Sequence, residues 1–126
     1  MTRFIEQLKN KIASVAKQNP SGFTFNPKRR QLVQKGYVVA SCCTQDCFGK
    51  KGLFKVIKFY LRHLDYCIGG WCNEEGIMQF DASRVYENVE DAVLAAIDNR
   101  QRAFYNLYTG KEITACDYSM WAHYQK

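Results

Sequence analysis

The stretch YCIGGWCNEEGIMQFDASRV, residues 66–85, decides the fold. Two runs rich in β-forming residues, Tyr66–Trp71 and Ile77–Val85, flank a polar turn at Asn73–Gly76. Runs of this kind, separated by a short turn that contains glycine, are typical of a β-hairpin. We therefore expect an antiparallel hairpin at the centre of the chain, with the other elements built around it.

Upstream of the hairpin, apolar residues recur at helical spacing over residues 3–17 and again over residues 50–64. Both patterns predict amphipathic helices. Between these helices, residues 23–25 and 37–40 have the composition of short strands, and Thr44–Gly49 is predicted to be a polar loop. The first half of the chain thus alternates helix, strand, strand, helix.

Downstream of the hairpin, Asn88 is a suitable N-cap, with Glu90 and Asp91 in the first turn of a third helix. Residues 104–108 and 111–114 follow as strands that are joined by a turn at Thr109–Gly110. The tail, residues 116–126, carries aromatic residues at a spacing of three and is predicted to be a short docking helix; these residues are Tyr118, Trp121 and Tyr124.

These elements indicate one α+β domain over residues 1–126, with a mainly antiparallel sheet of about five strands and helices on one face. A chain of 126 residues, 47% of them hydrophobic, is long enough to bury a core of its own. No apolar run reaches the length of a membrane span, and residues 1–17 lack the apolar segment of a secretory signal. We therefore expect a cytoplasmic protein without a membrane partner.

Charge is distributed unevenly along the chain. Residues 1–66 contain 13 Lys and Arg against 3 Asp and Glu, a net charge of +10, whereas residues 67–126 carry a net charge of −4. Four cations of the second predicted helix gather in one stripe on the side opposite its apolar residues; they are Lys51, Lys55, Lys58 and Arg62. Phe59 lies beside the stripe, and the predicted turn of Lys28, Arg29 and Arg30 would extend it.

Such a surface favours a non-enzymatic binding protein whose partner is either an acidic protein or a nucleic acid. The simpler interpretation is a solvated outer face, which every amphipathic helix has. A second alternative is oligomerisation through the aromatic tail. The sequence leaves both the choice of partner and the oligomeric state open.

A third alternative is a small enzyme with a pocket near the central hairpin. The pocket would contain Cys67, Gly69, Gly70, Trp71 and Asp81. We instead expect the two glycines to form a bulge beneath a core tryptophan. No phosphate-binding loop and no nucleophile elbow occurs in the chain, so an enzyme is not favoured and no cofactor is expected.

Six cysteines occur at positions 42, 43, 47, 67, 72 and 116. Their spacing, CCxxxC and CxxxxC, does not match the CxxC pairs that are typical of structural zinc sites. A disulfide framework belongs to exported chains. We therefore expect no metal site, most of the cysteines acting as small buried hydrophobes and the Cys42–Cys47 group partly exposed.

Several motifs resemble those of a family of small uncharacterised proteins from gut bacteria and their mobile elements. They are GYVVA at 36–40, Phe48–Gly49 ahead of Gly52–Leu53, IGGW at 68–71, YNL at 105–107 and GKEI at 110–113. The similarity covers about residues 22–113. It implies a domain without a defined activity, suits an accessory role on a mobile element, and implies that Cys42, Cys43 and Cys47 are individual variations.

Overall fold

A computed structural model describes residues 2–124 of the chain, with side chains described for residues 3–119. It contains four α-helices: α1 (Thr2–Gln18), α2 (Gly49–Arg62), α3 (Val89–Asp98) and α4 (Ala115–Tyr124). The helix bounds lie within two residues of those predicted for 3–17 and 50–64. Asn88 precedes α3 as expected, but its side chain forms no capping hydrogen bond. None of the helices in this part of the chain has the length and apolar composition needed to cross a membrane.

A single antiparallel sheet runs through the molecule. Its strands are β1 (Gly22–Asn26), β2 (Gln31–Leu32), β3 (Tyr37–Ala40), β4 (Cys47–Phe48), β5 (Cys67–Cys72), β6 (Met78–Tyr86), β7 (Ala103–Asn106) and β8 (Lys111–Thr114). Their order is β2-β1-β5-β6-β3-β7-β8, and β4 also pairs with β6. The α+β class is confirmed, but the number of about five strands was wrong, because the sheet has eight.

The additional strands are short, which explains why composition did not reveal them. β2 and β4 have two residues each and owe their conformation to pairing with β1 and β6. β4 falls inside the segment Thr44–Gly49, which was predicted to be a loop. Between β3 and β4 the ladder on β6 is interrupted by a short 3-10 turn, η1 (Cys42–Thr44), where the Thr44 hydroxyl accepts a hydrogen bond from the Ala82 amide.

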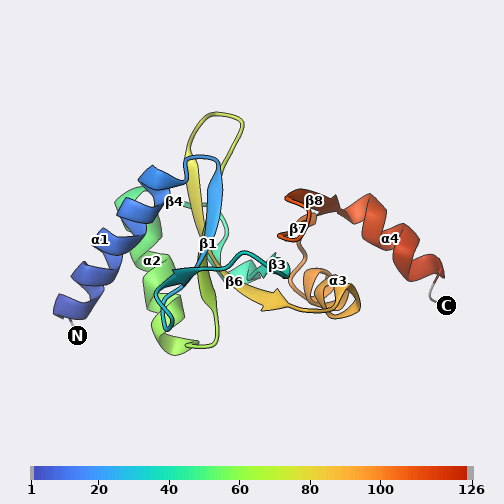
Figure 1. The fold of residues 1–126 in the computed structure, drawn as a ribbon, viewed down its shortest axis with the longest axis horizontal. Helices are drawn as coiled ribbons and strands as arrows, with labels where there is room; N and C mark the ends of the chain where they lie inside the picture. Colours follow the sequence, from blue (N-terminus) through green and yellow to red (C-terminus); the bar gives the residue numbers. More distant parts are fainter. Residues whose placement is uncertain (1, 125–126) are drawn as a thin grey trace.

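Two hydrophobic cores lie along the sheet. The first joins α1 and α2 to β1, β5 and β6 through Ile12, Ile57, Ile68 and Ala82, among others. The second joins α3 and α4 to β3 and β7, with Val39 and Phe104 from the strands. Figure 1 shows α1 and α2 at one end of the molecule and α3 and α4 at the other.

Strand register shows that both cores lie on the same face of the sheet. Ile68 pairs with Ala82 on β6, and Val39 pairs with Arg84 two residues further along β6. Because side chains alternate between faces along a strand, residues 82 and 84 point to the same side. The sheet residues of the two cores all share this side, so the opposite face carries no packed helix within the described residues.

Candidate functional site: the basic face of α2

The start of α2 is fixed tightly against β4. Gly49 adopts a φ of 67°, which turns the chain from β4 into the helix. Gly52, in the first turn, approaches the backbone of Cys47 so closely that a Cβ atom there would lie 2.5 Å from the Cys47 carbonyl carbon. The core-facing side of α2 is buried through Leu53, Val56, Ile57 and Tyr60. The helix therefore has one defined outer face.

That outer face carries the four predicted cations, Lys51, Lys55, Lys58 and Arg62. At 100° per residue they fall within a sector of about 60°, and all four are exposed. From Lys51 to Arg62 the stripe spans about 16 Å along the helix axis. The structure thus gathers these residues on one surface.

No acidic side chain neutralises this surface in the part of the chain that the structure describes. The ion pairs found there join Glu6 to Lys9 and Asp65 to Arg84. These two carboxylates are two of the three acidic residues among the first 66 residues, and the third is Asp46. The stripe therefore keeps its full positive charge.

Phe54 forms the aromatic part of this surface. Lys9 of α1 and Lys58 of α2 lie over its ring, with their Nζ atoms 5.8 and 5.5 Å from the ring centroid. The apolar periodicity of this helix predicted Phe54 on its core-facing side, which is wrong, because the ring is 40% exposed beside the stripe. The ring is exposed and extends the surface toward α1.

Phe59, which was predicted to lie beside the stripe, is partly buried in an aromatic cluster. Its ring stacks on His63 at a centroid distance of 4.3 Å and meets the edge of Tyr66 at 5.1 Å. These contacts fix the last turn of α2 against the start of β5. Phe59 therefore has less free ring surface than Phe54.

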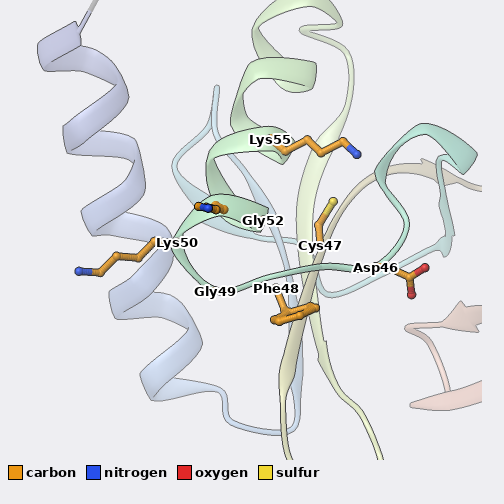
Figure 2. A pocket seen from close by; sticks show the side chains of 8 residues that line it. Asp46, Cys47, Phe48, Gly49, Lys50, Gly52 and Lys55 are labelled. Atoms are coloured by element: carbon orange, nitrogen blue, oxygen red, sulfur yellow. The ribbon is translucent and has the colours of Figure 1, made fainter.

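The first turn of α2 adds further positive charge. Lys50 and Lys51 lie in the first turn of α2, where acidic side chains would interact favourably with the helix dipole. The N-cap residue, Phe48, has no side-chain acceptor for the free amides of this turn. A surface cavity of about 480 Å³ opens here, lined by Phe48, Lys50, Lys51 and Lys55. Figure 2 shows the Lys55 side chain reaching over Cys47, whereas the Phe48 ring points to the other side of β4.

The predicted basic turn, Lys28–Arg30, is exposed and lies between β1 and β2. The amides of Lys28 and Arg29 donate to the Asn26 side chain, which holds the turn in place. Arg30 lines a second cavity, of about 440 Å³, together with Lys11 and Phe4 of α1. The turn therefore extends the positive surface along α1.

Most residues of the alternative pocket share the helix-free face of the sheet. Cys67 pairs with Ser83, Gly69 with Asp81, and Trp71 with Gln79, so these side chains point to one side. Gly70 points to the other side, where the Phe23 ring covers it. The expected bulge and core tryptophan are both wrong, because the register is regular and 53% of Trp71 is exposed.

The chemistry of this face does not favour nucleophilic catalysis. Burial raises the pKa of the Cys67 thiol to about 11, so the reactive thiolate is scarce at neutral pH. On the opposite, core-facing side, burial also raises the pKa of Cys47, an effect that nearby Lys55 opposes. Asp81 accepts a hydrogen bond from the Ser83 hydroxyl, and burial raises the pKa of this carboxyl as well.

The six cysteines are free thiols. Cys47 and Cys67 are buried, whereas Cys42, Cys43, Cys72 and Cys116 are exposed, so the expectation of mostly buried cysteines was wrong. Across the described residues, no three His, Cys, Asp or Glu side chains come together in a way that would hold a metal ion. The exposed thiols lie on separate elements apart from the adjacent pair in η1.

The aromatic tail forms α4, as predicted. Tyr118 is buried in the second core, where its ring lies 5.8 Å from that of Phe104 and its hydroxyl donates to the Gln101 carbonyl. The side chains of Trp121 and Tyr124 lie outside the described residues. Tyr118 therefore serves the core of this chain.

Comparison with known proteins found no protein-family model, no curated protein and no solved structure that matches this chain. The resemblance of residues 22–113 to a family from gut bacteria and their mobile elements, like the cytoplasmic location, stays a prediction.

Proposed function

We propose that this protein is a non-enzymatic binding protein that holds an acidic partner on the basic face of α2. The observation that carries this proposal is the stripe of Lys51, Lys55, Lys58 and Arg62, which is exposed along about 16 Å and forms no ion pair within residues 3–119. Four like charges at helical spacing repel one another. An anionic partner would remove this repulsion.

The surroundings of the stripe support the same proposal. Phe54 extends the surface toward α1, where Lys9 pairs with Glu6, and Lys50 extends it around the first turn of α2. The acidic residues of α3, which are Glu90, Asp91 and Asp98, lie at the other end of the molecule (Figure 1). This separation of charge would orient an approaching polyanion toward α2.

The proposal is tested with two variants of equal net charge. Lys55→Glu/Lys58→Glu removes the centre of the stripe, and Arg102→Glu/Lys111→Glu is the matched control on exposed positions outside the basic half. Each double variant lowers the formal net charge from +6 to +2. Retention on heparin and binding of a labelled oligonucleotide are measured from 50 to 300 mM salt.

We expect the stripe variant to lose at least tenfold in affinity and to show a flatter dependence of log K on log salt, because fewer counterions are released. The control variant should stay within about threefold of the wild type, since only the long-range field changes. Equal losses of affinity in both variants would show that binding depends only on the net charge of the protein, and would overturn the proposal.

A further inference from the structure

The helix-free face of the sheet carries an aromatic row that begins at β4, the strand that leads directly into α2. Trp71 of β5 and Phe48 of β4 both pair with Gln79 of β6, one on each side of it. The three side chains therefore point to the same face, opposite to the two cores. Because neighbouring strands lie about 4.8 Å apart, the two aromatic residues are separated by about 10 Å.

Both rings are available to a ligand. Trp71 is 53% exposed and Phe48 is 55% exposed, whereas Gln79 between them is only 9% exposed. The next pair of residues on this face, Gly69 and Asp81, projects little from the sheet. Gly69 has no side chain, and the Asp81 carboxyl lies over it and accepts a hydrogen bond from the Ser83 hydroxyl. The aromatic side chains thus project from a face whose neighbouring positions are small or tied down.

The aromatic row meets the positive surface at Phe48. This residue lines the same 480 Å³ cavity as Lys50, Lys51 and Lys55, and Asp46 is the acidic side chain among the lining residues (Figure 2). The Asp81 carboxyl, which lies on the same sheet face, accepts a hydrogen bond from the Ser83 hydroxyl. A ligand at this edge of the sheet therefore meets cations on one side of β4 and a free aromatic ring on the other.

We propose that the acidic partner is a single-stranded nucleic acid that crosses the β4 edge of the sheet, with its phosphates on the lysines that share the cavity with Phe48 and its bases stacked on Phe48 and then on Trp71. The inference rests on the proposed function and names the class of partner. The two aromatic residues, whose backbones lie about 10 Å apart across the sheet, do not match bases stacked about 3.4 Å apart in a duplex, but they suit splayed bases. Stacking on aromatic side chains next to a cationic groove is how proteins bind single strands without sequence preference.

The test compares two single-stranded probes of equal charge. One is a fluorescein-labelled 12-nucleotide oligo(dT), and the other is a 12-unit strand of abasic sites, which keeps the phosphates and lacks the bases. Fluorescence anisotropy is measured on the full chain at one fixed salt concentration. Wild-type protein should bind oligo(dT) at least tenfold more tightly than the abasic strand.

Phe48→Ala and Trp71→Ala should each weaken oligo(dT) binding about tenfold and leave abasic binding unchanged. Tyr108→Ala is the matched control, because Tyr108 is an aromatic residue of the same exposure, 53%, in the turn between β7 and β8 and outside the basic half. Trp71 adds a direct signal: oligo(dT) should quench tryptophan fluorescence in the wild type, and Trp71→Phe should abolish that change.

The outcomes separate the two proposals. If wild type binds both strands equally and Lys55→Glu/Lys58→Glu loses both, the basic face binds an anion but the bases are not stacked, and the inference is overturned. If neither strand binds even at 50 mM salt, a nucleic-acid partner is rejected, and the proposed function then depends on an acidic protein. Circular dichroism and thermal unfolding check that each variant folds.

Discussion

At the scale of single residues, the pKa of Asp81 changes when folding buries its carboxyl. It lies on the central strand β6, opposite Gly69, and its Oδ1 atom lies 2.7 Å from the position that a Cβ on Gly69 would take. Burial raises the pKa of the carboxyl, and the hydrogen bond from Ser83 opposes this rise only in part. The folded state therefore binds the Asp81 proton more tightly than the unfolded state does.

Stability should consequently depend on pH through this residue. A carboxyl whose pKa is higher in the folded state contributes its full stabilisation below the unfolded value near 3.8 and loses it as pH rises through the folded value. Asp81→Asn cannot ionise and still offers an oxygen to the Ser83 hydroxyl. Relative to wild type, the variant should gain stability between pH 4 and pH 7.

Urea unfolding of both proteins at pH 4, 5.5 and 7 measures this gain, since the difference between them cancels the titration of the other groups. A difference in unfolding free energy that stays constant across the three pH values would contradict the assignment.

At the scale of elements, the docking of α2 on β4 positions the basic face. Gly52 makes this docking possible, because any Cβ would lie 2.5 Å from the Cys47 carbonyl carbon and 2.9 Å from its Cα. Backbone atoms cannot rotate away as a side chain can. The orientation of the stripe and of the Phe48 ring both depend on this contact, since β4 runs directly into α2.

Gly52→Ala should therefore destabilise the protein by about 2 kcal/mol, as expected for overpacking against a fixed neighbour. Helix propensity alone predicts the opposite sign, because alanine is favoured over glycine inside a helix by up to about 1 kcal/mol. The control is Gly49→Ala, where nothing lies within 4 Å and only the positive φ is unfavourable, by about 1 kcal/mol. Chemical denaturation measures both values, and a stabilised Gly52→Ala variant would show that the contact does not constrain α2.

At the scale of the whole molecule, two hydrophobic cores lie at opposite ends of one sheet. The core under α1 and α2 takes Ile68 and Ala82 from the acidic second half, and the core under α3 and α4 takes Val39 from the basic first half (Figure 1). β6 connects the two ends by pairing with β5 along one part and with β3 along another. Binding at one end should thus be separable from packing at the other.

Tyr118→Ala tests this separation. Removal of the buried ring from the second core should cost about 3 kcal/mol, whereas Tyr118→Phe loses only a hydrogen bond, about 1 kcal/mol. We expect hydrogen exchange to accelerate in β7 and β8 while β1 and β5 stay protected, with oligo(dT) binding unchanged. Equal acceleration in all four strands would show that the two cores unfold as one unit.

The sequence by itself determined the elements that rest on local patterns. Apolar spacing predicted α1 and α2 within two residues, the central hairpin was predicted from its composition and turn, and helical geometry placed Lys51, Lys55, Lys58 and Arg62 on one face. These features depend on neighbours close in the chain, so periodicity is enough to predict them.

Only the tertiary structure decided what depends on pairing between distant segments. β2 and β4 are too short to have a pattern of their own and exist because β1 and β6 supply hydrogen-bond partners. Strand pairing also places Trp71 on the helix-free face, where the sequence had predicted a core residue. It aligns Phe48 with Trp71 across β6. A shift of one residue in register reverses which face a side chain occupies, and no local pattern fixes that register.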